Sequence, residues 1–207
     1  MTRRTLDPVQ RRRLRVAAQL LAYPDGAFFE RLPLLARAAA TVGDPSLDAF
    51  LAHVEATPAE TLTTSYVETF DLRRRTCLYL TYYSHGDTRK RGMALLRFAH
   101  AYRTHGFEIV DGELPDHLAV VCEFTAAEPG EGLRLLTEHR AGLELLRMAL
   151  DEAGSPYLLA VDAVRAALPD PAPRDMDKAL ALARSGPPAE EVGLEPFGPP
   201  EVMGGRR

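Results

Sequence analysis

The sequence predicts an all-α protein: a single compact helical domain of about nine or ten helices, followed by a flexible C-terminal tail. Leucine and alanine each occur 30 times in 207 residues, whereas isoleucine occurs once. Helix formers therefore dominate and β-branched strand formers are scarce, which excludes a β-sandwich or barrel. The length suits one domain better than two. We assign residues 1–185 to the helical domain and residues 186–207 to the tail.

Four helices are predicted in the N-terminal third from capping residues and prolines. Asp7-Pro8 is typical of an N-cap followed by a first-turn proline. Thr57-Pro58-Ala59-Glu60 has the form of a capping box. Pro33 is the one expected interruption. These helices are expected at about 8–22, 25–42, a short segment from 45 that carries Leu47, Phe50, Leu51 and Val54 at helical spacing, and 57–70.

Six further helices are predicted in the rest of the chain. Gly86 and Gly106 are expected stops, and Leu114-Pro115 is an expected start. The helices span an aromatic segment ending before Gly86, then about 87–105, 114–127, 131–153, 155–168 and 175–184. The tail is rich in proline and glycine and is expected to be disordered, or docked on the body through VGLEPF at 192–197.

Composition excludes several classes of protein. No apolar run approaches the roughly 18 residues that cross a bilayer, and no secretory signal follows the basic N-terminus. The two cysteines, Cys77 and Cys122, have no CxxC partner, which excludes a disulfide scaffold and favours a small buried thiol at each position. We therefore expect a cytoplasmic protein that does not insert into the membrane.

Charge is segregated along the chain although the net charge is only −4. Residues 1–15 carry +5 and residues 71–91 carry +4, whereas residues 107–132 carry −7 with no lysine or arginine. A stretch so acidic is typical of a docking surface for a basic partner. The run LYLTYY at 78–83 lies between two arginine clusters, and it fits a core helix with basic ends as well as a nucleic-acid contact.

Conventional catalytic and metal-binding motifs are absent from the sequence. It contains no GxSxG, HExxH or GxxxxGK[ST] pattern. His100 and His105 are five residues apart and do not share a helical face, and His139 follows a leucine stripe, which favours packing at the edge of the core over a ligand role. We therefore predict no catalytic residue, no metal site and no bound cofactor.

Helical geometry gathers several acids of the −7 stretch. At 100° per residue, Glu113, Asp116 and Glu123 fall within an arc of about 80°. His117 and Phe124 lie on the border of this predicted acidic stripe. The opposite face is expected to pack inward through Leu114, Leu118, Val121, Cys122 and Thr125, which leaves Asp116 and Glu123 exposed. Ordinary solvated carboxylates and a docking surface both remain possible explanations.

Residues 69–124 resemble the core of the NarJ family. The segments that carry the resemblance are DLRRR at 71–75, LTYY followed by GDTRKRGMALL within 80–96, and ELPDHL at 113–118. LLAYPD at 20–25 and VGLEPF at 192–197 also resemble family members. The family belongs to the wider TorD/DmsD-like group of redox-enzyme maturation chaperones.

The resemblance implies a cytoplasmic, all-helical chaperone without catalytic activity. Its client would be the catalytic molybdenum (alpha) subunit of respiratory nitrate reductase, bound by the N-terminal segment. The chaperone would keep that subunit competent until molybdopterin guanine dinucleotide is inserted. In the wider group an acidic-proline-Asp-His motif lies at the peptide-binding surface, and it corresponds here to Glu113, Asp116 and His117.

From the residues themselves we add Glu123 to this partner-binding set, and we expect Tyr82, Tyr83 and Phe124 to form the aromatic wall of a groove. Two other functions stay open. A metal-dependent helical hydrolase could use Asp116 and His117, although adjacent helical residues diverge by 100°. An arginine-rich regulator could bind nucleic acid.

Overall fold

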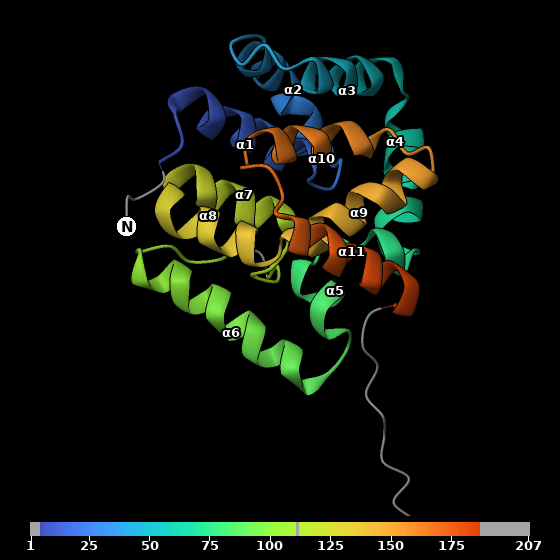
Figure 1. Ribbon diagram of the computed structural model, residues 1–207. Helices are drawn as coiled ribbons and strands as arrows, with labels where there is room; N and C mark the ends of the chain where they lie inside the picture. The colour runs from blue at the N-terminus through green and yellow to red at the C-terminus, as the bar shows by residue number, and fades with distance from the viewer. Residues whose placement is uncertain (1–4, 111, 187–207) are drawn as a thin grey trace, which may run out of the picture.

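The computed structural model describes residues 5–110 and 112–186, and this part of the chain is helical throughout with no β-strand (Figure 1). These described residues form eleven α-helices, one more than the upper expectation. They are α1 (Pro8–Leu20), α2 (Gly26–Ala40), α3 (Pro45–Ala56), α4 (Ala59–Tyr66), α5 (Leu80–His85), α6 (Arg89–Thr104), α7 (Leu118–Ala127), α8 (Pro129–Glu138), α9 (Arg140–Glu152), α10 (Tyr157–Ala166) and α11 (Pro173–Ser185). A π-helical turn (Val67–Asp71) and a 3-10 turn (Arg74–Thr76) separate α4 from α5.

Aspartate side chains begin the first three helices, as the sequence predicts for the first. Asp7 accepts a hydrogen bond from the Gln10 amide at 2.8 Å and forms a full capping box. Asp25 and Asp44 cap α2 and α3 in the same way, at 2.7 and 2.9 Å. These caps satisfy N–H groups that have no partner within the helix.

The centre of the molecule is α1, which packs against α7, α10 and α2. Leu14, Leu20 and Leu21 have no exposed surface. Beside them an aromatic cluster forms around Tyr157, whose ring centroid lies 4.8 Å from that of Phe70 and 5.1 Å from that of Phe50. Helices α2 and α3 lie at one end of the molecule and α6 at the other (Figure 1).

One predicted cap and two predicted boundaries are wrong. The expected helix at 57–70 is α4 followed by the π-turn, and its N-terminus has no side-chain cap. The expected helix at 131–153 is two helices that meet at His139, because the chain turns there to pack α9 against α5 and α11. The expected helix at 114–127 begins only at Leu118.

None of the described helices is long and apolar enough to span a bilayer. The predicted tail, residues 186–207, lies outside the described residues except for Gly186. The proposed docking of VGLEPF therefore stays a prediction.

Candidate peptide-binding groove

A cavity of about 920 Å³ opens to the surface where α5, α9 and α11 meet. Cavities of several hundred Å³ are typical of ligand-binding sites. We call it the α5–α9 groove. Its lining is Arg74, Arg75, Tyr82, Tyr83, Gly86, Asp87, Leu145, Met148, Ala149, Asp151, Glu152, Leu182, Ala183 and Gly186.

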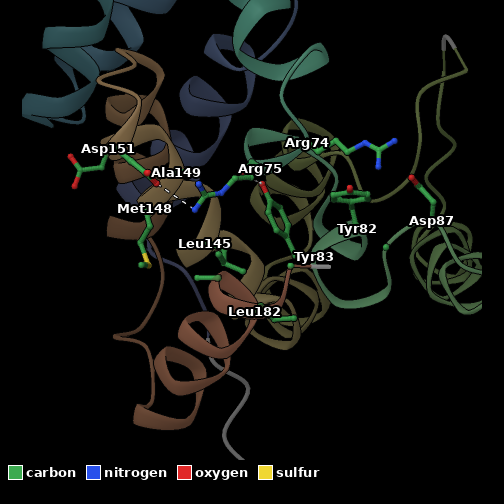
Figure 2. A pocket seen from close by; sticks show the side chains of 14 residues that line it. Arg74, Arg75, Tyr82, Tyr83, Asp87, Leu145, Met148, Ala149, Asp151 and Leu182 are labelled. Carbon is green, nitrogen blue, oxygen red and sulfur yellow. Dashed lines mark hydrogen bonds and ion pairs between the residues drawn. The ribbon is translucent and has the colours of Figure 1, made fainter. Parts of the chain in front are cut away.

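The groove is apolar inside and charged at its edges. Leu145 and Met148 from α9 face it together with Leu182 from α11, and Tyr82 and Tyr83 line it from α5 (Figure 2). The charged members of the lining come from two directions: Arg74 and Arg75 from the 3-10 turn, and Asp87, Asp151 and Glu152 from the loop after α5 and the end of α9. An apolar trough with charges of both signs at the edge suits an amphipathic peptide.

Tyr83 fixes the inner wall of the groove. Its hydroxyl donates a hydrogen bond to the Cys77 carbonyl at 2.8 Å, and the Arg75 carbonyl lies at 3.2 Å. Burial raises the pKa of Tyr83 well above its ordinary value, so the phenol stays neutral and keeps this donor.

Gly142 allows α5 to approach α9 closely. A Cβ at this position would lie 3.1 Å from the Tyr83 ring and 3.3 Å from the Leu80 carbonyl oxygen. Because Gly142 has no side chain, α5 and its Tyr83 ring can lie directly against α9 at this position.

Asp116 is buried, and the prediction that it lies exposed on a helical acidic stripe is wrong. It has no exposed surface, and its Oδ2 accepts hydrogen bonds from the Thr81 amide at 3.0 Å and the Thr81 hydroxyl at 2.6 Å. Because Tyr79, the N-cap residue of α5, makes no side-chain cap bond, Asp116 caps this helix from 35 residues away. Asp116 is thus a positioning residue for the wall of the groove.

The backbone explains why residues 114–117 are not helical. The Leu80 amide donates to the Asp116 carbonyl at 3.1 Å, and the Leu118 amide donates to the Leu78 carbonyl at 2.8 Å. These two bonds form an isolated antiparallel bridge between Tyr79 and His117. The bridge turns Asp116 inward and leaves Leu114, which was expected to be buried, 37% exposed.

Arg91 and Glu113 extend the contact between the two segments. Arg91 Nε donates to the Thr81 hydroxyl at 3.3 Å, and the guanidinium lies 5.6 Å from the centroid of the Tyr79 ring. The Tyr79 hydroxyl donates to Glu113 Oε1 at 3.2 Å. We call Tyr79, Thr81, Arg91, Glu113 and Asp116 the α5 network. It joins the neighbouring LTYY and GDTRKR segments to the ELPDHL segment, which begins at residue 113.

His117 is buried beside this network and does not line the groove. Its ring centroid lies 5.4 Å from that of Tyr79. Burial lowers the pKa of His117 and outweighs the opposing effect of Glu113 and Asp116. His117 is therefore a neutral packing residue at pH 7.

Of the seven predicted partner-binding residues, the structure brings only Tyr82 and Tyr83 to the groove. Glu123 is exposed on α7, where it accepts a hydrogen bond from Gln19 of α1. Phe124 is buried against Tyr102, with ring centroids 4.6 Å apart. Val121 and Cys122 are buried as expected.

Sequence reasoning missed the groove residues Leu145, Met148 and Leu182. The first two belong to an apolar stripe that reads as ordinary core, and Leu182 lies on a short helix near the C-terminus. Nothing local marks them, because they line one cavity only after α9 packs against α11.

The metal-dependent hydrolase gains no support from these side chains. No group of three or more His, Cys, Asp and Glu residues that could hold a metal occurs within residues 5–110 and 112–186. The Asp116 carboxylate is already bonded to Thr81. Both cysteines are free thiols, and burial raises the pKa of Cys77 to about 11.

The fold and the sequence both have relatives. The family model described as nitrate reductase delta subunit matches residues 35–162. The chain is 43% identical over 152 residues to the nitrate reductase-like protein NarX of Mycobacterium tuberculosis H37Rv, which covers 72% of this chain but only 23% of NarX. The chain therefore spans about a quarter of the length of that relative.

Two shorter relatives match over more of their length. NarJ of Bacillus subtilis 168 is 33% identical over 154 residues, covering 72% of this chain and 84% of that protein. The nitrate reductase molybdenum cofactor assembly chaperone NarJ of Escherichia coli K12 is 32% identical, covering 71% of this chain and 65% of that protein.

A solved structure from Archaeoglobus fulgidus, provisionally assigned as a redox enzyme maturation protein, shares the fold. It superposes with a TM-score of 0.60 at 24% identity and covers 75% of this chain and 91% of that chain. With the family match across most of the helical body, the chain belongs to the nitrate reductase delta subunit family, together with the NarJ proteins.

Proposed function

We propose that this protein is a dedicated assembly chaperone for respiratory nitrate reductase. It binds the N-terminal segment of the apo catalytic alpha subunit and keeps that subunit competent for insertion of molybdopterin guanine dinucleotide. It acts in the cytoplasm, holds no cofactor itself and catalyses no reaction. The relatives named as NarJ chaperones support the role, and the observation that carries the binding mode is the α5–α9 groove.

The groove suits one face of an amphipathic helix. Apolar side chains at i, i+3 or i+4 would pack against Leu145, Met148 and Leu182, opposite the aromatic wall that Tyr82 and Tyr83 form on α5. Basic groups of the peptide would meet Asp87, Asp151 and Glu152 at the edge. Arg75 and Glu152 already form an exposed ion pair at 3.4 Å, which a charged peptide can exchange for its own contacts.

Calorimetry with a synthetic peptide of the client's N-terminal segment tests this proposal. Met148→Glu places a carboxylate in the apolar part of the groove, and since Met148 is only half-buried the fold tolerates it. We expect binding at least about tenfold weaker, because the new charge must be desolvated when the peptide binds. Leu34→Glu on α2, 57% exposed and distant from the groove, is the matched control and leaves affinity unchanged.

Equal affinity of Met148→Glu and the native protein would place the client elsewhere. Co-purification of the apo alpha subunit from cells then separates the two parts of the proposal. If Met148→Glu does not bind the peptide but still co-purifies with the alpha subunit, the groove is not the only contact with the client. If the native protein neither binds the peptide nor co-purifies with the alpha subunit, the chaperone function is rejected.

A further inference from the structure

The outer face of α6 combines exposed apolar and basic side chains. Met93 is 67% exposed and Leu96 is 56% exposed, and the two are three residues apart on the same helical face. Two large apolar side chains exposed side by side on one helix need an explanation, whereas isolated exposed leucines do not. The inner face of the same helix is ordinary core, with Phe98 and Tyr102 buried.

Positive charge surrounds this apolar pair. Lys90 and Arg97 are exposed on one side of it and Arg103 on the other, with His100 between. Helix α6 contains no aspartate or glutamate.

The shape of this surface distinguishes between kinds of partner. Helix α6 lies at the edge of the molecule, with its outer face turned away from every other helix (Figure 1). Its 16 residues form a straight ridge about 24 Å long. A convex ridge lies flat on a plane, whereas peptides are usually held in grooves.

We infer that the outer face of α6 is a peripheral contact for an anionic lipid surface. Met93 and Leu96 would enter the region between headgroups and acyl chains, and Lys90, Arg97 and Arg103 would meet the lipid phosphates. The contact is reversible and weakened by salt, because two apolar side chains and a few charges give only modest affinity. It is independent of the α5–α9 groove, so its failure leaves the proposed function untouched.

Co-sedimentation with vesicles tests the inference. We expect the native protein to sediment with vesicles of equal parts phosphatidylglycerol and phosphatidylcholine at low salt, but not with pure phosphatidylcholine vesicles. Leu96→Ser/Arg97→Glu should lower the partition coefficient by at least about tenfold. Each basic residue near an anionic surface raises that coefficient about fivefold, and the variant replaces one of them with an acid. Added salt at about 0.5 M should release the native protein.

Helix α2 provides the control. Leu34→Ser/Arg37→Glu makes the same two kinds of substitution at exposed positions of α2, at the opposite end of the molecule, although its two positions are three residues apart and not adjacent. This variant should bind vesicles like the native protein. No binding of the native protein, equal binding to both kinds of vesicle, or equal loss in both double variants would each overturn the inference. Circular dichroism of every variant confirms that the helical body is intact.

Discussion

Asp116 is predicted from the sequence to be an exposed partner-binding residue, but in the fold it is buried and caps α5. Its type and neighbours are those of an exposed acidic motif, and helical phasing places it beside Glu123. The phasing fails because residues 116–118 pair with residues 78–80, about 40 positions earlier in the chain, and so the helix begins only at Leu118. That pairing depends on a long-range contact, which periodicity within a single segment does not contain.

Replacing this carboxylate should cost measurable stability. Asp116→Ala leaves the buried Thr81 amide and hydroxyl without their acceptor, so we expect the free energy of unfolding to fall by about 2–3 kcal/mol. Urea unfolding followed by circular dichroism measures it. Glu123→Ala, an exposed carboxylate on α7, should change stability by no more than about 0.5 kcal/mol. Equal effects of the two substitutions would show that Asp116 does not hold α5.

His139 should make stability depend on pH. Burial, together with the nearby His85, Lys178 and Arg97, lowers the pKa of His139 to about 4, and its Nδ1 is buried without a partner. Below pH 6.5 the unfolded chain takes up the proton before the folded chain does. The stabilisation is therefore complete above about pH 6.5 and is lost as the pH falls toward 4.

Urea unfolding at several pH values measures this effect. Between pH 6.5 and pH 4 the native protein should lose about 1–3 kcal/mol more than His139→Gln. The exposed His100→Gln variant should follow the native curve. Parallel curves for His139→Gln and the native protein would contradict the assignment.

At the scale of elements, close packing decides where helices begin, end and approach one another. The sequence predicted α1 and α3 well, because their caps and apolar spacing are local. It joined α8 and α9 into one helix because their leucines continue the same periodicity, and only the packing of α9 against α5 and α11 requires the break at His139. The sides of the groove formed by α9 and α11 could not be predicted for the same reason, whereas Tyr82 and Tyr83 on α5 were expected there.

The contact between α7 and α8 depends on a single glycine. A Cβ on Gly132 would lie 2.7 Å from Thr125 Cβ and would also meet the Thr125 backbone. Gly132→Ala should therefore lower the free energy of unfolding by about 1–3 kcal/mol, although alanine favours helix by about 1 kcal/mol. Gly130→Ala in the same helix meets nothing within 4 Å and should be neutral or stabilising. Thermal unfolding of both variants decides, and a stabilised Gly132→Ala would mean that α8 can shift without cost.

At the scale of the whole molecule, the charge pattern of the sequence is redistributed by the fold. The −7 stretch was expected to form one acidic surface, but its members separate: Asp116 turns inward, Glu113 bonds to Tyr79, and Glu123 faces α1. The basic stretch at 71–91 divides in the same way, since Arg75 reaches the edge of the groove and Arg91 joins the α5 network. Net charge along a segment therefore did not predict which charges share a surface in the folded chain.

The helical body should fold without the C-terminal segment. A chain that ends after Gly186 keeps the hydrogen bond that the Gly186 amide donates to the Leu182 carbonyl at the C-terminus of α11. We expect the thermal midpoint to fall by less than about 8 °C, since 1 kcal/mol shifts a domain of this size by roughly 2–4 °C. Calorimetry of the shortened chain measures it, and a larger fall would show that residues 187–207 contribute to the core.

The central position of α1 has a consequence for the order of events during synthesis. Its apolar face is covered by α7 and by α10, which begins at Tyr157. At roughly 5–20 residues per second, the ribosome needs about 7–30 s to synthesise the chain from the end of α1 to α10. During this interval the face of α1 that packs against α10 has no native partner there. The protein is proposed to cover the N-terminal segment of another chain, yet during its own synthesis its first helix stays partly uncovered until α10 has been made.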